Sequence, residues 1–559
     1  MKRCSIVTLL LLVLVSKNLH AQSNYLPLNP SYYHSIDRYE VLSGKLYSEF
    51  HTSVKPYTRK SVANFARNLS SDTIYNARDQ FNFSYLQNDS WEWADSSTGN
   101  NKPVLKHFYK KKSDFFHVHT KDFDLHVNPS LYFAAGYEQG RGPVTINTRG
   151  AEVRGMIDQK VGFYSFFADN VLLLPDYVKA YRDVRFVVPG EGFNKPFKSN
   201  PNGADFITAR GYFNFNATKN IALQFGHDKN FIGNGYRSLI LSDFSNSYTF
   251  LKLNTNIWKI NYMNLFAEMT ATYSLGDKLF PKKYMAFHHL SINIGKNLNI
   301  GLFESVAFRG RSSDSTKWGK FDITYLNPII FYRSVEQQLG SSDNALLGMD
   351  YKWNFLRHFS LYGQFVLDEF LLSHIKARDG WWANKQAAQV GLKYINLAGI
   401  KNLDAQVELN YIRPYVYMHG TPYTNFTHYN QPIAHPLGAN LYEYIAILHA
   451  QPLKRLQATA KLFYIKQGLD AADSLNWGGD LFKNYAQYEQ EFGNKTAQGT
   501  PSTTLMSSLS ISYMVFHNFF VESTVIVRNQ NVAEPLVSSN TLIGTFAMRW
   551  NIARRLQEF

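Results

Sequence analysis

The sequence has almost no cysteine and, beyond its first 20 positions, no long apolar run. Cys4 is the only cysteine among 559 residues, which excludes the small disulfide-stapled scaffolds of secreted proteins. A membrane protein that crosses with helices needs about 20 consecutive apolar residues per span, and no such run follows the N-terminus. The chain nevertheless contains 42 Phe, 36 Tyr and 9 Trp. Because disordered chains are poor in aromatic residues, that class is excluded as well.

The first 21 residues have the pattern of a secretory signal peptide. Lys2 and Arg3 precede an apolar stretch that is unbroken from Leu9 to Val15, and Ala21 is a small residue suited to cleavage. Cys4 precedes the apolar stretch, whereas the cysteine of a lipoprotein would follow it, so no lipid anchor is expected. We therefore expect residues 1–21 to be removed on export, which leaves a mature bacterial envelope protein without cysteine.

From about residue 115 onward, short segments alternate apolar and polar residues with a period of two. This is the pattern of a strand with one dry and one wet face. In one such segment the apolar face carries Ala405, Val407, Leu409 and Tyr411. A soluble sandwich or barrel that packs its apolar face on a core would show the same alternation.

Three details favour a transmembrane barrel over a soluble one. The wet faces repeatedly carry Arg, Lys, Glu, Gln and Asn, which suits a hydrated or plugged lumen. Aromatic residues such as Trp258, Trp353 and Trp550 gather near segment ends, as the girdles at two membrane interfaces would require. Brief turns also alternate with long polar loops. The sequence therefore predicts an all-β fold: a transmembrane antiparallel outer-membrane β-barrel of about 18 strands.

The N-terminal part has a different periodicity. Ile36, Tyr39 and Leu42 recur at helical spacing, as do Val62 and Phe65, so amphipathic helices are expected between Pro30 and about Asn88. The expected organisation is a signal peptide (1–21), a helical periplasmic or plug segment (22–112) and a barrel with long extracellular loops (113–559). The chain ends in Phe559, similar to the terminal aromatic residue of bacterial outer-membrane barrels.

Several segments carry a resemblance to a known family. The main ones are Phe225–Ser238, with the sequence FGHDKNFIGNGYRS, and His435–Asn440, with the sequence HPLGAN. Further support comes from Leu326–Pro328, Glu336–Gln338, Asn344–Gly348 and Arg413–Tyr415. Together they resemble the Wzi-like capsule-assembly family, and within it the gliding-motility RemB type, over most of the chain from about residue 30.

The resemblance implies a large outer-membrane barrel with a helical plug. It also implies that the protein binds or organises surface polysaccharide, or supports gliding motility and adhesion. Its surroundings would be outer-membrane lipid and lipopolysaccharide, and its partners capsular or exopolysaccharide or other surface motility proteins. No nucleic-acid partner is expected.

The glycine-rich segment Gly226–Gly235 superficially suggests a phosphate-binding loop. It does not open a helix in a βαβ unit, as a nucleotide site requires. One interpretation is a tight, internally bonded loop folded into the barrel, with Gly233 and Gly235 permitting positive φ. The alternative is ligand contact by three side chains: His227, Asn230 and Arg237.

Aromatic residues in the polar loops are the stronger candidates for ligand binding. Sugars stack their C–H faces on aromatic rings while polar side chains bond the hydroxyl groups. The candidate glycan contacts are Trp318, Trp381, Trp382, Tyr417, Tyr423 and Trp477. These rings could instead anchor loops at the membrane interface or fill the lumen.

The sequence offers little for catalysis or metal binding. It has no GxSxG elbow, and the mature chain has no cysteine nucleophile. His117 and His119 could share one face of a strand, but no third ligand is placed near them. We therefore expect no enzymatic activity, no cofactor and no metal.

Two functional classes remain after these exclusions. The formal charge of +15 could attract acidic polysaccharide, or it could offset the phosphates of the outer leaflet. A surface-binding protein and a porin-like transporter for solutes or oligosaccharides are both compatible with a polar lumen. A helical segment that plugs the lumen would favour the first class.

Overall fold

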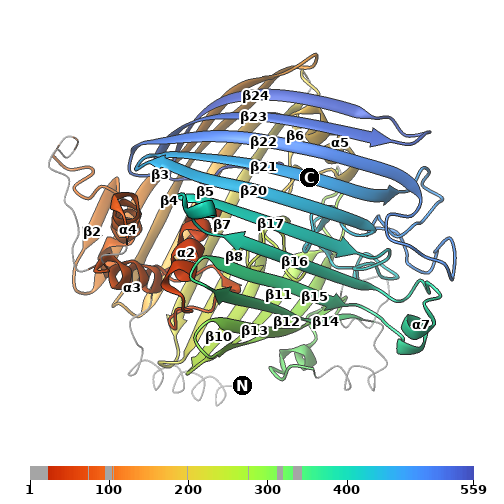
Figure 1. The fold of residues 1–559 in the computed structure, drawn as a ribbon, viewed down its shortest axis with the longest axis horizontal. Coiled ribbons are helices and arrows are strands. Elements are labelled where there is room, and N and C mark those ends of the chain that lie inside the picture. The colour runs from red at the N-terminus through yellow and green to blue at the C-terminus, as the bar shows by residue number, and fades with distance from the viewer. Residues whose placement is uncertain are drawn as a thin grey trace.

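The computed structural model describes residues 23–72, 75–94, 104, 106–197, 199–274, 276–310, 319–331 and 343–559. Eighteen strands form one closed antiparallel barrel (Figure 1). Each strand pairs with the next, and β24 returns to β3 with Trp550 opposite Leu131, which closes the ring. The barrel strands are β3 (Phe123–Glu138), β4 (Gly142–Ile157), β5 (Val161–Leu173), β7 (Gly203–Asn216), β8 (Ile221–Asp228), β10 (Tyr248–Ile257), β11 (Ile260–Thr270), β12 (Lys282–Ile294), β13 (Leu298–Phe308), β14 (Asn344–Phe355), β15 (Phe359–Leu367), β16 (Gln386–Tyr394), β17 (Leu403–Ile412), β20 (Leu441–Leu453), β21 (Leu456–Leu469), β22 (Thr500–Phe516), β23 (Phe519–Val532) and β24 (Ser539–Trp550).

Short strands and helices complete the described part of the chain. The short strands are β1 (Val54–Lys55), β2 (Phe116–His119), β6 (Lys195–Pro196), β9 (Phe231–Ile232), β18 (Thr427–His428) and β19 (Gln431–Pro432). The helices are α2 (Pro30–Ser43), α3 (Arg59–Ser70), α4 (Ala77–Asp89), α5 (Asp176–Arg185) and α7 (Leu372–Ala377), with 3-10 turns η2 (Trp91–Trp93), η3 (Ile323–Leu326) and η4 (Leu397–Gly399). Within the described residues, every helix is too short or too polar to cross a membrane.

The alternation along each strand places apolar residues outside and polar residues inside. On β7, Ile207 and Phe213 are each 60% exposed, whereas their neighbours Thr208 and Asn214 point inward and are buried. The outer face of other strands carries Phe167, Phe225, Val407, Leu448, Leu462, Leu509 and Phe546. An exposed apolar band over a polar interior is the surface that a lipid bilayer covers. The predicted transmembrane antiparallel barrel is confirmed.

The two ends of the barrel differ in the length of their connections. At one end the turns span only residues such as 158–160, 258–259, 454–455 and 517–518. At the other end long loops connect the strands, among them 413–440 and 470–499. In bacterial barrels the short turns face the periplasm and the long loops face the exterior. Helices α2, α3 and α4 lie at the short-turn end (Figure 1, left).

The N-terminal helices begin at well-defined caps and share an apolar core. The Asn76 side chain accepts hydrogen bonds from the first turn of α4, and Asp79 completes a capping box. The three helices bury a common cluster that includes Tyr39, Phe65 and Phe83. This small core gives the segment its own packing.

Ion pairs fix these helices to the barrel wall. Arg38 of α2 pairs with Asp404, and its guanidinium also donates to the Asn396 side chain at 2.7 Å. Lys352 of β14 donates to Glu40 at 2.7 Å and also pairs with Asp37. Since a charge buried alone is costly, these pairs determine where α2 can sit.

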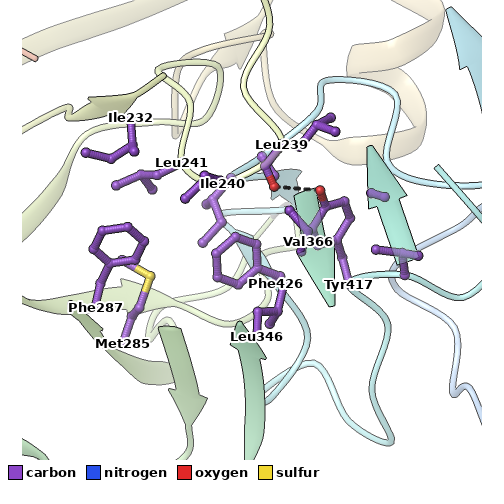
Figure 2. Close-up of a cluster of buried hydrophobic side chains, with 14 of the residues drawn as sticks. Ile232, Leu239, Ile240, Leu241, Met285, Phe287, Leu346, Val366, Tyr417 and Phe426 are labelled. Atoms are coloured by element: carbon purple, nitrogen blue, oxygen red, sulfur yellow. Dashed lines mark hydrogen bonds between the residues drawn. The ribbon is translucent and has the colours of Figure 1, made fainter. Parts of the chain in front are cut away.

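The outer end of the lumen is filled by two long loops that fold inward. Loops 229–247 and 413–440 pack against inward-facing strand residues in a dry cluster of buried apolar side chains, which we call the outer seal (Figure 2). It includes Ile232, Leu239, Ile240, Leu241, Met285, Phe287, Leu346, Val366, Tyr417 and Phe426. The Tyr417 hydroxyl donates to the Leu239 carbonyl at 2.6 Å and joins the two loops.

The last nine residues, 551–559, form a tail that turns from β24 into the lumen. Arg554 pairs with Glu522 at 2.8 Å, and Glu558 pairs with Lys461 at 2.8 Å. The Phe559 ring lies 5.1 Å from Tyr181. The terminal aromatic residue therefore belongs to the interior packing and not to the final strand.

Candidate functional site

The long loops bring aromatic rings together at the outer end of the barrel. Loop 368–385 supplies Trp382, whose ring stacks on two tyrosine rings of loop 470–499. The centroid distances are 5.4 Å to Tyr485 and 4.6 Å to Tyr488. The Trp382 amide donates to the Glu491 carbonyl at 2.9 Å, which ties the two loops together. We call Trp381, Trp382, Tyr485 and Tyr488 the aromatic cluster.

Trp381 extends this cluster along one edge. Its ring stacks on His374 of α7 at 4.7 Å, and the two tryptophan rings lie 6.4 Å apart. His374 is hydrogen-bonded to Asp379 at 2.5 Å, and this bond holds the pKa of the Asp379 carboxyl below its usual value. The edge therefore presents partly exposed rings beside a carboxylate, which is the combination that sugar recognition requires.

Two nitrogen-containing side chains border the cluster on its inner side. The Lys385 ammonium group lies 4.4 Å from the centre of the Tyr485 ring, a cation–π distance. The His419 ring lies 4.9 Å from the same tyrosine, and burial lowers the pKa of His419 to about 4. His419 is therefore neutral at physiological pH, and the buried Lys385 ammonium group pairs with Glu369 at 3.5 Å.

Among the six candidate aromatic residues, the structure brings together only Trp381 and Trp382. Tyr417 is fully buried in the outer seal. Tyr423 lies under Arg309, whose guanidinium carbon is 4.7 Å from the ring centre. The Trp477 amide donates to Asp470 at 2.8 Å in another part of loop 470–499. Trp318 lies outside the described residues.

The three polar candidates of the glycine-rich segment do not converge on one ligand position. His227 lies on the exposed, outward face of β8, 3.2 Å from the Thr249 hydroxyl. Asn230 is buried and accepts from the Lys252 ammonium group at 3.0 Å. Arg237 is buried and pairs with Glu443 at 2.9 Å.

The two glycines behave differently from each other. Gly233 has φ +138°, as the sequence predicts. The prediction for Gly235 is wrong, because its φ does not lie in the positive region. A Cβ atom there would stand 2.6 Å from a Glu408 carboxylate oxygen, so close approach to the barrel wall explains this glycine.

Tyr485, Tyr488, His374 and Lys385 were missed by the sequence analysis. The only sequence signal for them is the aromatic and polar composition of loops 368–385 and 470–499. Within the described residues, no three His, Cys, Asp or Glu side chains gather as a metal site.

The family model for the capsule assembly protein Wzi matches residues 87–532. The chain belongs to the Wzi capsule-assembly family. The family resemblance of the sequence is thereby confirmed, and the fold and family place this Wzi-family chain in the bacterial outer membrane. Among curated proteins, none matches it by sequence alone.

The solved structure of one Wzi protein shows the same fold at low sequence identity. Wzi of Escherichia coli, described as an outer-membrane carbohydrate-binding β-barrel involved in group 1 capsule assembly, is 13% identical with a TM-score of 0.56. The match covers 96% of this chain and 100% of that one. OprD of Pseudomonas aeruginosa is 12% identical with a TM-score of 0.41, covering 76% of this chain and 94% of that one. OccAB2 of Acinetobacter baumannii is 6% identical with a TM-score of 0.43, covering 77% and 97%.

In this Wzi-family chain, parts of the main segments that carry the family resemblance lie in the interior. Ile232 of Phe225–Ser238 and Ala439 of His435–Asn440 both belong to the apolar cluster of the outer seal. The aromatic cluster lies on loops 368–385 and 470–499, outside these two segments.

Proposed function

We propose that this protein binds surface polysaccharide through its outer loops and so helps to organise a capsule-like layer at the cell surface. The observation that carries the proposal is the aromatic cluster on the outward-facing loops of a Wzi-family barrel. Partly exposed rings beside the Asp379 carboxylate supply stacking and polar contacts together. Loops with such side chains on a rigid scaffold are typical binding surfaces.

The porin-like alternative fits the interior less well. The outer seal fills the exterior end with packed apolar side chains, and α2 is fixed at the other end by buried ion pairs. A conducting pore needs a continuous hydrated path through the lumen. These two closures favour binding over transport.

The proposal also covers processing, partners and setting. Signal cleavage after Ala21 would leave a plug segment (22–112) and a barrel (113–559) that acts without enzymatic activity or a cofactor. Capsular or exopolysaccharide is the proposed ligand, and lipopolysaccharide the surrounding lipid.

The resemblance of Phe225–Ser238 to RemB-type proteins supports a role in gliding and adhesion. Loss of surface spreading in a deletion strain would test this role.

Binding of the cell's own surface polysaccharide to the purified, detergent-solubilised protein tests the proposal directly. Trp381→Ala is expected to weaken binding roughly 2- to 12-fold, because one stacked ring contributes about 0.5–1.5 kcal/mol. Trp258→Ala is the matched control, since Trp258 is 80% exposed on a short turn at the opposite end. Equal binding by wild type and Trp381→Ala, or no binding by wild type, would contradict the proposal.

A further inference from the structure

The lumen contains a cavity of about 420 Å³ between the N-terminal helices and the inward-folded loops. We call it the lumen chamber. Its walls come from the plug segment, the barrel strands, loop 229–247 and the tail 551–559. Two of its lining residues, Pro30 and Ser31 at the start of α2, are exposed at the short-turn end. The volume lies in the range of small-molecule sites, and the exposed residues mark its entrance.

The chamber wall carries an excess of positive charge. Eleven lysines and arginines line it, against seven aspartates and glutamates. Several are paired: Arg59 with Asp89 at 2.9 Å, for example. Pairing of this kind offsets the cost of removing each charge from water.

Arg210 is the exception. It projects inward from β7 into the chamber. Among the described residues it has no hydrogen bond and no carboxylate within 4.0 Å, and its Nε is buried without an acceptor. Its nearest described interaction is with the Phe166 ring, 5.5 Å from the guanidinium carbon.

Lys229, from loop 229–247, is a second cation of the chamber wall that lacks a carboxylate partner in the described part of the chain. Its ammonium group donates to the carbonyls of Gly190 and Asp243 at 2.9 Å and 3.1 Å. The carboxylates of Glu191 and Asp243 attract both cations electrostatically, but neither lies within 4.0 Å of them in the described part of the chain. Glu191 pairs with Arg555 at 2.9 Å, and Asp228 accepts the Lys229 backbone amide at 2.8 Å.

Neutral polar groups stand beside these cations. Thr208, Asn170 and Tyr164 line the same wall of the chamber. Hydroxyl and amide groups of this kind bond the hydroxyls of a sugar, whereas the fork of an arginine matches a carboxylate or phosphate. Thr208 donates to Glu191 at 3.0 Å and Asn170 donates to Thr208 at 3.1 Å, so Arg210 is the main group that this wall offers to a ligand.

We propose that the lumen chamber binds an anionic ligand of sugar size, which bears a carboxylate or a phosphate, with Arg210 as its main charged contact and Lys229 beside it. A bound anion would give Arg210 the charge-assisted hydrogen bonds that it lacks. The site uses other residues and the opposite entrance from the aromatic cluster, so it is independent of polysaccharide binding by the outer loops.

Calorimetric titration of the full-length, detergent-solubilised protein tests this site, with glucuronate, glucose 1-phosphate and glucose as probes. At least one anion is expected to bind and glucose is not; the comparison of the two anions shows which acid group the chamber takes. Arg210→Gln should weaken anion binding at least about 10-fold, since a hydrogen bond to a charged group contributes about 1.5–3 kcal/mol.

The controls separate charge, folding and the outer loops. Arg210 makes no hydrogen bond or ion pair among the described residues, so Arg210→Gln should lower the thermal midpoint only slightly, through loss of the contact with the Phe166 ring. Arg210→Lys retains the charge without the fork and should bind with intermediate affinity. Arg141→Gln removes one exposed charge from the hairpin at the outer end and should bind as wild type, as should Trp381→Ala. Failure of both anions to bind, equal binding of glucose, or unchanged binding by Arg210→Gln would overturn the proposal.

Discussion

Single charged side chains in the lumen determine how the plug is held and where a ligand can bind. Lys352 is fully buried, and its two partners on α2 are carboxylates. Removal of one partner from such a group leaves an uncompensated buried charge, at a cost of about 3–5 kcal/mol. The same physics makes Arg210 informative, because it has no ion pair among the described residues and the proposed anionic ligand would supply one.

Because Lys229 can lose its charge, anion binding in the lumen chamber is expected to depend on pH. Burial lowers the pKa of its ammonium group to about 8; Arg210 and Arg555 lower it too, while Glu191 and Asp243 raise it. The ammonium group of a lysine in an unfolded chain has a pKa of about 10.4. Below pH 8 the folded protein therefore carries this charge at a cost to its stability, and a bound anion offsets that cost.

We predict that glucuronate affinity falls several-fold between about pH 6 and about pH 9. Burial lowers the pKa of Lys55, which also lines the chamber, to about 7, and that of Lys229 to about 8, while the glucuronate carboxylate stays charged. Calorimetric titrations across this range measure the effect. Lys229→Gln should remove the part of the fall centred near pH 8, and a variant that kept the same pH profile would rule out Lys229 as a source.

At the scale of elements, the tail 551–559 is the least expected feature. The chain could have ended at β24, whose pairing with β3 already closes the barrel. Instead Arg555 reaches Glu191 at 2.9 Å, and Phe559 packs near Tyr177 and Phe244 at 5.7 Å and 6.0 Å. The tail acts as an internal strut, by which we mean that its ion pairs and ring contacts stabilise the region between the chamber and the outer seal.

Deletion of residues 554–559 is expected to leave an assembled barrel with lower thermal resistance. Lys461 and Glu191 lose their partners, each at a cost of up to about 3–5 kcal/mol, whereas the strand pairing is untouched. The midpoint of the heat-induced change in electrophoretic mobility should fall by several degrees. Glu558→Gln should give a smaller fall and Glu534→Gln, in an exposed loop, none. A wild-type midpoint after the deletion would show that the tail is not a strut.

At the scale of the whole molecule, two closures lie in series along one lumen. The outer seal is apolar and dry, and the inner closure is helical and held by ion pairs. The lumen chamber lies between them. This order separates the periplasmic entrance of the chamber from the aromatic cluster outside.

The purified protein is expected to show no large conductance steps in a planar bilayer, because the outer seal closes the lumen with packed apolar side chains. Tyr417→Ala with Phe426→Ala loosens the outer seal and is expected to show more frequent openings than the wild type. Large, long-lived open steps in the wild type would support the porin alternative instead. A known porin reconstituted in the same bilayer serves as the positive control.

The barrel could be predicted from the sequence because alternation with a period of two is a local property. Ile207, Ala209 and Phe213 share a face whatever the rest of the chain does. The helical spacing around Tyr39 and Phe65 is local in the same way. The site was predicted only in part: Trp381 and Trp382 are adjacent, but their stacking partners lie about a hundred residues further along the chain.

By itself, the sequence determined the strand pattern, the helical N-terminal segment and the family. Only the tertiary structure decided which loops fold inward, that Phe559 lies in the lumen, and that Arg210 has no described partner while Arg237 has Glu443. The physical reason is that periodicity depends only on residues that are close in the sequence. Pairing of buried charges and stacking of rings depend on segments that meet only when the barrel closes.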